Sequence, residues 1–476
     1  MDRRSSLIRR EVLCQTAKGL LAGKPEELHK IPFHITNNNE SINRCCIHHD
    51  RAVIRARIIS ALGFKYDQIS DETILSELWE NIPEDMDQVS PQISILPEAC
   101  STCPEQELLV TDLCRTCLDK SCQSLCPKDA ISFHPKAFID QDKCIKCGKC
   151  QSGCAYGAIV KTKIPCQEAC PVKAIERNHN EPARIDPDKC IDCGKCLISC
   201  PFGAPVSPSY MGMVAKKLFQ KEVPMVAMLA PSIQGQLPGT YKQLLNSLYL
   251  LGFDYVTEVA SGAIETIKAE GQELTEQLEE GKGFMTSSCC PVYQRLAHIH
   301  IPDMVNHISE TPSPLTFTGR QWKNKNIFRV FIGPCLGKKR EARLNGSAEA
   351  VLTFEELGAL LVAKGIQVEE QWDNTLQETW NTAPREGHNF AASGGVSKAV
   401  AEATGIKDDR IQKLEGIDRK AVLILNSYAK RPGTVNFDFL EVMACQEGCV
   451  GGPGNICSSK ILKRSLEEFT ESTVKS

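Results

Sequence analysis

The sequence lacks several features that would point to common classes of protein. Its longest apolar runs, such as Val223 to Pro231, are far shorter than the roughly 20 residues that span a membrane. The formal net charge is -4 with 24% charged residues, so no basic excess indicates nucleic acid or an anionic membrane as the main partner. The start, MDRRSSLIRREVL, has neither the apolar stretch nor the small-residue cleavage site of a secretory signal. We therefore expect a cytoplasmic protein without membrane or nucleic-acid partners.

Cysteine, in contrast, is abundant. The chain has 25 cysteines, of which sixteen lie between Cys100 and Cys200 and only three precede them. Cytosolic thiols are kept reduced, so metal binding explains this number better than a disulfide framework does. The uneven placement predicts a cysteine-dense module inside a longer chain.

The patterning divides the 476 residues into three parts, since the chain is too long for one hydrophobic core. Helical patterns at 51–64 and 71–82 predict a helical N-terminal region over residues 1–98. Short loops and cysteine repeats occupy residues 99–208, and residues 209–476 indicate α/β structure with largely parallel sheets. In this last part, strand-like runs at 223–231, 253–260, 326–333 and 421–427 alternate with helical stretches that include 355–365 and 393–405.

Two cysteine runs read C-x2-C-x2-C-x3-C, from Cys144 to Cys154 and from Cys190 to Cys200. This is the bacterial ferredoxin signature, in which three thiolates hold one 4Fe-4S cubane and the fourth ligates a neighbouring cluster. A third run, Cys114 to Cys126, has two extra residues between its second and third cysteines. A half-motif, Cys166-x3-Cys170, lacks two ligands, which the pair Cys100-x2-Cys103 can supply.

The crossing rule of ferredoxins assigns all sixteen cysteines to four complete clusters. The four groups are Cys114, Cys117, Cys122 with Cys154; Cys144, Cys147, Cys150 with Cys126; Cys190, Cys193, Cys196 with Cys170; and Cys100, Cys103, Cys166 with Cys200. Pairs of the form C-x2-C also bind zinc, but zinc sites do not need the recurrent C-x3-C step. We therefore expect a ferredoxin-like domain with four 4Fe-4S clusters that relay electrons. Such a relay does not by itself indicate which reaction the protein catalyses.

Five of the six remaining cysteines fall in three short motifs: SSCCP at 287–291, GPCLGKKRE at 333–341 and EVMACQEGCVGG at 441–452. Their order, the tandem Cys-Cys-Pro, the P-C-x-x-K and the M-A-C-x-x-x-C resemble the three signature motifs of [FeFe] hydrogenases. The resemblance covers the ferredoxin repeats and about residues 210 to 455. Within the family, the chain is similar to the monomeric, ferredoxin-linked branch. It implies an α/β catalytic domain with largely parallel sheets in two lobes around an H-cluster, preceded by tandem ferredoxin-like α+β modules and a small helical N-terminal region.

An H-cluster is a 4Fe-4S cubane joined through a cysteine sulfur to a diiron unit that carries carbonyl, cyanide and a bridging azadithiolate. The resemblance implies that Cys290, Cys335, Cys445 and Cys449 hold the cubane and that Cys449 bridges to the diiron unit. Cys289 is then left unligated, and its role in the family is to exchange a proton with the bridging amine. A buried cysteine beside a cluster can equally be an inert hydrophobe.

Two glutamates resemble the family's proton relay. Glu270 and Glu273 lie at i and i+3 of a predicted helix, and Ser309 matches the hydroxyl between them. The resemblance implies the order Cys289, Glu270, Ser309, Glu273 and solvent. Without it, two glutamates on a helix indicate a solvated face.

Two residues of the second motif complete the expected site. Lys338 matches the lysine that donates to an iron-bound cyanide, although a K-K-R run is also typical of a surface, where we place Lys339 and Arg340. Glu341 matches a further acidic residue near the site.

The expected pocket also has an apolar lining. Pro231 and Ser232 end a predicted strand and resemble the segment that lines the diiron pocket, while Met443 matches a thioether packed against it or simply packs in the core. Four cysteines belong neither to the relay clusters nor to the expected H-cluster site, and we interpret them as structural thiols: Cys14, Cys45, Cys46 and Cys457.

The expected function is reversible reduction of protons to dihydrogen, with electrons from a soluble ferredoxin, because no flavin or nicotinamide motif is present. Proteins that mature the diiron site are implied as partners, and a monomer is the simplest expectation. The alternative is a sensory or low-activity hydrogenase-like iron-sulfur protein. Relatives that serve cluster assembly tend to lose the proton-shuttling residues, whereas this chain keeps them. A ferredoxin-like carrier fused to an unrelated enzyme is a third reading, which the three motifs disfavour.

Overall fold

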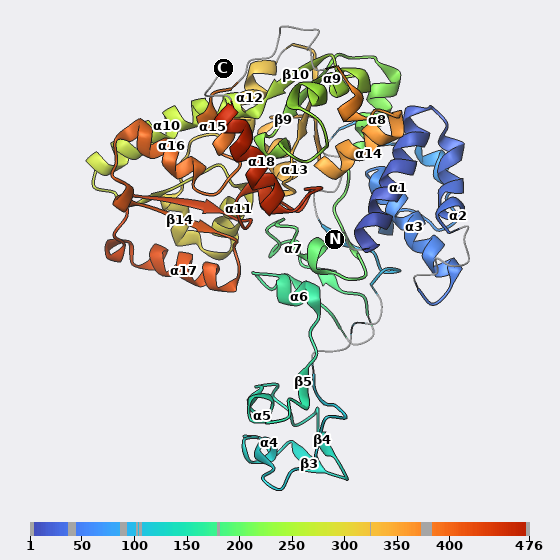
Figure 1. Ribbon diagram of the computed structural model, residues 1–476, viewed down its shortest axis with the longest axis vertical. Coiled ribbons are helices and arrows are strands. Elements are labelled where there is room, and N and C mark those ends of the chain that lie inside the picture. The colour runs from blue at the N-terminus through green and yellow to red at the C-terminus, as the bar shows by residue number, and fades with distance from the viewer. Residues whose placement is uncertain are drawn as a thin grey trace.

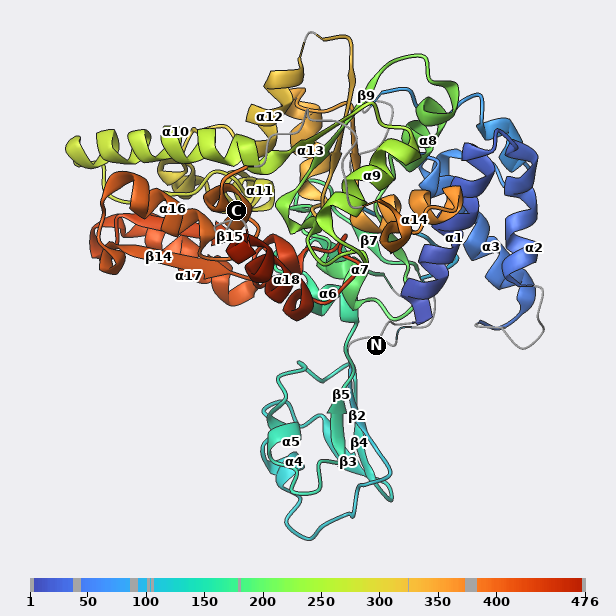
Figure 2. The ribbon, with the colours of Figure 1, turned by 45° about the horizontal axis from the view of Figure 1, so that its top comes forward.

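The computed structural model describes residues 4–36, 44–85, 93–100, 103, 107–178, 181–323, 325–372 and 383–472. Figure 1 shows an α/β body, a set of N-terminal helices packed on one side of it, and a small lobe that projects away from both. The second view shows the same projection of the small lobe (Figure 2). No helix in these described ranges combines the length and the apolar character that crossing a membrane requires.

The N-terminal helices pack against the α/β body. They are α1 (Arg4–Leu21), α2 (Ile31–Ile35) and α3 (Ile47–Ala61), with 3-10 turns at Pro25–Lys30, Tyr66–Gln68 and Leu75–Leu78. Helix α3 confirms the helical pattern at 51–64. The helix expected over 71–82 is wrong, because a single 3-10 turn already buries Leu75 and Leu78, and Pro83 follows it closely.

The cysteine-dense part is built from short antiparallel pairs. Strands β2 and β5 pair, as do β3 and β4, β6 and β7, and β1 and β8. The elements are β1 (Ser94–Ile95), β2 (Leu108–Val110), α4 (Ser121–Ser124), β3 (Ile131–Phe133), β4 (Ala137–Ile139), α5 (Lys149–Ser152), β5 (Ile159–Lys161), α6 (Pro165–Ala169), β6 (Ile175–Glu176), β7 (Arg184–Ile185), α7 (Lys195–Ser199) and β8 (Pro205–Val206). The projecting lobe consists of β2 to β5 with α4 and α5, and α6 and α7 lie against the α/β body (Figure 1).

The first sheet of the body has four parallel strands in the order β10-β9-β12-β13. Its elements are α8 (Met211–Gln220), β9 (Met225–Leu229), a 3-10 turn (Pro231–Ile233), α9 (Tyr241–Leu251), β10 (Tyr255–Glu258), β12 (Phe328–Ile332), β13 (Ala350–Leu352), α14 (Phe354–Lys364) and a 3-10 turn (Val368–Glu370). Every residue of β9, β12 and β13 is buried, as expected for parallel strands covered on both faces. The strand-like runs at 223–231, 253–260 and 326–333 and the helix at 355–365 are confirmed.

The second sheet is also parallel, in the order β11-β15-β14. The remaining elements of the body, including these three strands, are α10 (Val259–Glu279), β11 (Met285–Thr286), α11 (Pro291–His300), a 3-10 turn (Pro302–His307), α12 (Pro314–Trp322), α13 (Gly337–Asn345), α15 (Arg385–Asn389), α16 (Gly395–Thr404), a 3-10 turn (Asp408–Arg410), β14 (Ile411–Glu415), α17 (Arg419–Lys430), a 3-10 turn (Pro432–Thr434), β15 (Phe439–Met443), a 3-10 turn (Cys449–Gly451) and α18 (Ser459–Ser472). The helical stretch at 393–405 is confirmed as α16.

The strand expected at 421–427 is wrong, because this segment lies within helix α17. Its buried residues Ala421, Leu425 and Ala429 recur every four positions, whereas Leu423 is 68% exposed. The Asp418 side chain accepts a hydrogen bond from the Ala421 backbone N–H and caps the helix. A continuous apolar run is thus divided between a buried face and an exposed face.

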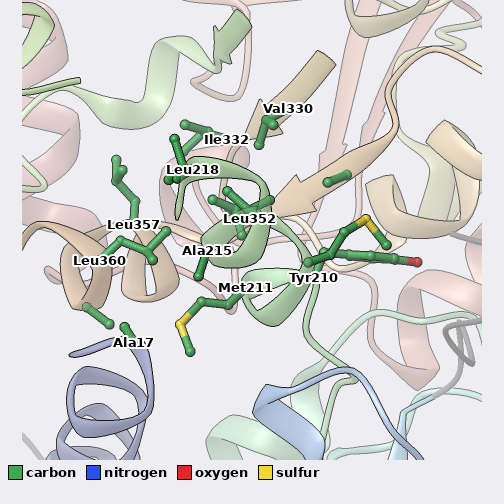
Figure 3. Close-up of a cluster of buried hydrophobic side chains, with 14 of the residues drawn as sticks. Ala17, Tyr210, Met211, Ala215, Leu218, Val330, Ile332, Leu352, Leu357 and Leu360 are labelled. Carbon is green, nitrogen blue, oxygen red and sulfur yellow. The ribbon is translucent and has the colours of Figure 1, made fainter. Parts of the chain in front are cut away.

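The main core lies between the first sheet and the N-terminal helices. Figure 3 shows Ala17 of α1, Met211 and Ala215 of α8, and Leu357 and Leu360 of α14 in one buried cluster. The guanidinium groups of Arg9 and Arg10 add ion pairs to the Glu355 carboxylate at 2.8 and 3.0 Å. Helix α1 is therefore held to α14 by both apolar packing and charge.

Candidate functional site

The three cysteine motifs follow strands of the two parallel sheets. Cys289 and Cys290 come after β11, Cys335 after β12, and Cys445 and Cys449 after β15. Parallel strands place their carboxyl ends at one edge, where ligands of open α/β sheets bind. The topology therefore brings motifs that are far apart in sequence to one place between the two sheets.

Cys290, Cys335, Cys445 and Cys449 are partly buried and lie close to one another. Burial raises the pKa of Cys335, and the neighbouring charges of Cys290 and Cys449 raise it further. Burial likewise raises the pKa of Cys445, with Cys335, Cys449 and Cys290 as further causes. Four thiols in such mutual reach ionise only if a positive charge compensates them, which is the condition that bound iron meets.

An apolar cavity lies over these cysteines. It is lined from the first sheet by Pro231 and Ser232, and from the second by Cys289 and Met443. The buried Ser232 hydroxyl has no hydrogen-bond partner among the described residues, so a donor is available to a group in the cavity. Further lining residues that the motifs did not indicate are Val259, Ala263, Pro314, Leu315, Phe331 and Phe390.

Lys338 also lines the cavity and is held by several partners. Its Nζ lies 2.6 Å from Glu341 Oε2 and donates to Ser313 Oγ at 3.1 Å and to the Cys289 carbonyl at 3.3 Å. Desolvation acts to lower the pKa of Lys338, but the Glu341 carboxylate more than offsets it and the pKa is raised. Ser313 also donates to Glu341. Glu341 thus contacts the lysine and does not line the cavity.

Lys339 and Arg340 are not free surface residues, which corrects the expectation from the K-K-R run. The Lys339 side chain is buried, donates to the Pro208 carbonyl at 2.7 Å and lies 3.7 Å from the Glu356 carboxylate. The Arg340 guanidinium contacts Asp192 at 2.7 Å. Helix α13 therefore uses its consecutive basic residues to join different parts of the chain.

Glu270 is fully buried in helix α10 beside Cys289. Its Oε1 accepts a hydrogen bond from the Ser288 backbone N–H at 2.9 Å. Burial raises the pKa of Glu270 to about 7, with the nearby Glu273 charge as a further cause. Burial also raises the pKa of Cys289, and the Glu270 charge is the next cause. The Glu270 charge therefore favours the neutral form of the neighbouring thiol.

Ser309 lies between the two glutamates. Its hydroxyl donates to Glu273 Oε2 at 2.6 Å, and it also interacts with the Glu270 side chain. Thr311 donates to the same Glu273 oxygen at 2.8 Å. Glu273 is only half-buried, so this set of polar groups runs from the fully buried Glu270 to the surface.

Glu441 is a buried carboxylate that the motif analysis did not single out. It accepts hydrogen bonds from the backbone N–H groups of Gly394 and Ser397 at 2.7 and 2.8 Å, at the start of α16. Burial raises its pKa. The sequence does contain a sign of this site, because Glu441 is the single charged residue in an otherwise apolar strand. A buried charged side chain needs hydrogen-bond partners.

In each of the four expected groups, cysteines of the repeat region lie near other members of their group. Cys122 lies within charge range of Cys117 and Cys154, and Cys150 of Cys144 and Cys126. In the third group, burial raises the pKa of Cys190 to about 12, and Cys193 and Cys170 are among its neighbours. In the fourth, burial raises the pKa of Cys166 to about 11, with contributions from Cys200, Cys100 and Cys103.

A repeated backbone turn explains why the groups form. The third residue after the last cysteine of each run has positive φ: Asp129, Gly157, Lys173 and Gly203. In three of the turns the next residue, an alanine, donates its N–H to the cysteine sulfur at 3.2 to 3.4 Å; the cysteines are Cys126, Cys154 and Cys170. Such N–H groups stabilise thiolates and tune cluster potentials.

The spacing of the cysteines does not match single zinc ions. Thiolates bound to one zinc ion at about 2.3 Å lie within about 4 Å of each other. Among the residues that the structure describes, no three histidine, cysteine or acidic groups are arranged to share one metal ion. A cubane separates its four cysteines more widely, because each binds a different iron atom.

The third cysteine group adjoins the cavity site. The charge of Cys193 contributes to the raised pKa of Cys445, after burial and the three neighbouring cysteines. Asp192 lies between the guanidinium groups of Arg340 and Arg295, at 2.7 and 3.5 Å, and fixes the loop against the α/β body. Contacts between residues far apart in the sequence therefore connect the cysteine repeats to the cavity.

Comparison with known proteins agrees with this arrangement. The family described as iron only hydrogenase large subunit, C-terminal domain, matches residues 223–453, and a 4Fe-4S binding domain matches 136–159 and 182–205. Iron hydrogenase 1 of Clostridium pasteurianum is 29% identical, covering 69% of this chain and 67% of that protein. The periplasmic [Fe] hydrogenase large subunit of Nitratidesulfovibrio vulgaris is 28% identical, covering 52% and 72%.

More distant matches have other names or weaker similarity. A probable cytosolic Fe-S cluster assembly factor of Brugia malayi is 24% identical, covering 45% of this chain and 57% of that protein. A solved variant of [FeFe]-hydrogenase HydA1 from Chlamydomonas reinhardtii is 20% identical, covers 52% of this chain and 85% of that chain, and has a TM-score of 0.41.

Cysteine ligand groups that lead into a parallel-sheet α/β body define an iron-sulfur protein. The class of iron-sulfur protein is specified further by the matched family model, the 4Fe-4S domain and the named relatives. Residues 223–453 belong to the iron-only, or [FeFe], hydrogenase family.

Proposed function

We propose that the protein is an [FeFe] hydrogenase that interconverts protons and dihydrogen, using electrons delivered through four 4Fe-4S clusters. The position of Cys289 carries the proposal. This thiol lines the cavity beside the ligand cysteines, and Glu270, Ser309 and Glu273 connect it to the surface. A protein that only stores or assembles clusters has no need of this chain of acids.

The cavity residues fit an H-cluster. Cys290, Cys335, Cys445 and Cys449 would hold its cubane, and Cys449 would also hold the diiron unit. When bound, this cofactor supplies the redox chemistry and the metal site at which dihydrogen is formed or split. The unpaired Ser232 hydroxyl is a donor for its anionic ligands, and the Lys338 ammonium supplies a positive charge beside them, while Pro231 and Met443 provide apolar walls.

The protein's own groups then move the proton. Cys289 exchanges it with the cavity, and Glu270 exchanges it with Cys289. Ser309 relays it between Glu270 and Glu273, and Glu273 exchanges it with solvent. A Glu270 pKa of about 7 suits proton transfer both toward and away from the cavity near neutral pH, because a relay group works best when its pKa lies near the operating pH. Glu341 positions Lys338.

A soluble ferredoxin is the proposed electron partner, and the projecting lobe is where it docks. Residues 108–161 include eight basic and five acidic residues, a charge of +3, although the whole chain carries -4. Cys147 is exposed there, close to Lys146 and Lys149, which are also exposed. The lobe further exposes eight large apolar residues: Leu109, Leu113, Leu118, Leu125, Phe138, Ile145, Tyr156 and Val160. A basic surface with apolar patches suits transient contact with an acidic carrier.

The organisation that supports this function has a helical region over 1–98, the ferredoxin-like relay over 99–208 and the catalytic domain over 209–476. The protein works in the cytoplasm as a monomer and receives its diiron unit from maturation proteins. The alternative is a sensory or low-activity hydrogenase-like protein, and the assembly-factor relative indicates a non-catalytic form of it.

Infrared spectroscopy tests the proposal. Protein matured with the diiron cofactor should show iron-bound carbonyl and cyanide stretches, and it should evolve dihydrogen from a reduced viologen dye. Intact cubanes without these bands would assign the protein to the assembly or sensing class. Bands with negligible turnover would favour the sensory alternative.

A further inference from the structure

Two cysteines outside both metal systems lie on the surface at the start of helix α3. Cys45 and Cys46 are exposed, and their sulfur atoms are 4.0 Å apart. Their exposure corrects the expectation that they are structural thiols, because such thiols pack in apolar surroundings. Neither cysteine belongs to any of the ligand groups.

Cys45 is paired with an imidazole. Its sulfur lies 3.1 Å from His49 Nδ1, and His49 Nε2 lies 2.5 Å from the Glu98 carbonyl oxygen. A carbonyl only accepts hydrogen bonds, so Nε2 carries the hydrogen and Nδ1 of the neutral ring is free to accept the thiol proton. A thiol, a base and a group that orients the base form the arrangement that activates cysteine nucleophiles.

Cys46 has a second source of activation. The backbone N–H of His49 lowers the pKa of the Cys46 thiol, with the Cys45 side chain and the His48 backbone N–H as smaller causes. Asp50 opposes this shift, but the Arg44 guanidinium lies 3.8 Å from the Asp50 carboxylate. The Cys46 thiol is therefore favoured as an anion by backbone donors.

The other two cysteines without a metal role provide a contrast. Burial raises the pKa of Cys14 to about 11. Cys457 is half-buried, and its sulfur lies 3.7 Å from the Gln236 carbonyl oxygen. Both are poor nucleophiles by comparison, so they serve as internal standards.

From this geometry we propose that Cys45 and Cys46 form a redox modification site, at which Cys45 reacts with small disulfides to give a mixed disulfide. The Cys45 proton passes to His49 Nδ1 while the sulfur attacks one sulfur of the disulfide. The new S–S bond forms as the old one breaks, and the departing thiolate takes the proton from His49. One disulfide replaces another, so no further oxidant or reductant is required.

The mixed disulfide persists because Cys46 cannot easily displace it. Adjacent Cα atoms are about 3.8 Å apart, below the usual separation of about 4.4 to 6.8 Å across a disulfide. A direct Cys45–Cys46 bond is thus disfavoured. The site also lies close to the relay, because His49 contacts the Glu98 carbonyl two residues before the ligand Cys100.

Competitive labelling of the cluster-loaded protein under anaerobic conditions tests this inference. A short pulse of iodoacetamide at pH 7, followed by peptide mass mapping, should label Cys45 and Cys46 at least about tenfold faster than Cys14 and Cys457. Treatment with dithiobis(nitrobenzoate) should leave a nitrothiobenzoate adduct on Cys45. Equal labelling rates for Cys45 and Cys14, or loss of the adduct with formation of a Cys45–Cys46 disulfide, would overturn the proposal.

Two histidine variants separate the activation of Cys45 from a general change in exposure. His49→Gln keeps the backbone N–H and should slow Cys45 labelling about tenfold, while Cys46 labelling and the cluster absorption stay unchanged. His48→Gln, at the exposed neighbouring position, should change neither rate. An unchanged Cys45 rate in His49→Gln would refute the role of the imidazole.

Discussion

The buried carboxyl of Glu270 gives the sharpest prediction. Replacing it by Gln keeps the size of the side chain and its acceptor for the Ser288 N–H, but removes the proton that the relay exchanges. Proton transfer by a positioned group contributes about 100-fold to 10,000-fold to a rate. We therefore expect Glu270→Gln to lower dihydrogen evolution by at least about 100-fold with its clusters intact.

The same group makes stability depend on pH. Its pKa rises from an ordinary 4.5 to about 7 in the folded protein, a difference equivalent to about 3 kcal/mol. Because the folded state binds the proton more tightly, stability is full below pH 4.5 and declines as pH rises through 7. Glutamine cannot ionise, so Glu270→Gln should match the parent protein at about pH 4 and exceed its stability by up to about 3 kcal/mol at pH 8.

Difference infrared spectroscopy can follow the carboxyl directly. The parent protein should show a protonated carboxyl band that titrates near pH 7 and is missing from Glu270→Gln. Glu265→Gln is the matched control, since Glu265 lies on the same helix, is exposed and pairs with Lys268. The reasoning fails if Glu270 titrates near 4.5, or if Glu270→Gln retains more than about a tenth of the parent turnover.

Three further changes probe the other parts of the site. Cys289→Ala should keep the cubanes and the diiron infrared bands while nearly abolishing turnover, and retained activity would remove the thiol from the proton route. Cys100→Ala should cost one 4Fe-4S cluster, seen as lower iron content than in the control Cys14→Ala; equal iron would exclude the fourth relay site. Lys146→Glu with Lys149→Glu should raise the KM for an acidic ferredoxin at least about threefold at low salt, with a smaller difference at high salt, whereas an unchanged KM would place docking elsewhere.

Local spacing made most of the site predictable. The ligand groups depend on cysteines a few residues apart, and the same turn follows the last cysteine of every run. The insertion in the first run does not disturb this, because Leu118 is fully exposed and Lys120 takes the left-handed conformation that Gly148 and Gly194 take in the other runs. Strand ends placed the remaining cysteines, since parallel sheets gather their carboxyl edges.

Contacts between distant segments determine the features that residue spacing in the sequence did not predict. The run at 421–427 became a helix because only one side of it meets the core, and apolar composition alone does not show this. Lys339 was assigned to the surface because its partner Glu356 lies in a different motif, seventeen positions away. The Cys45–His49 pair depends on the distant Glu98 carbonyl, which no local pattern reveals.

The tandem Cys-Cys motif has a physical reason in the extended chain that follows β11. Successive side chains of an extended backbone point to opposite sides, and the two cysteines pack in different apolar clusters. Cys290 lies with Cys335 and the relay residue Cys193, whereas Cys289 lies with Met443 and with Ala263 and Ile267 of the helix that carries Glu270. In the proposed function, electrons reach the cavity on one side of this pair and protons on the other. Electron transfer and proton transfer should then be separable by mutation, although the two residues are adjacent.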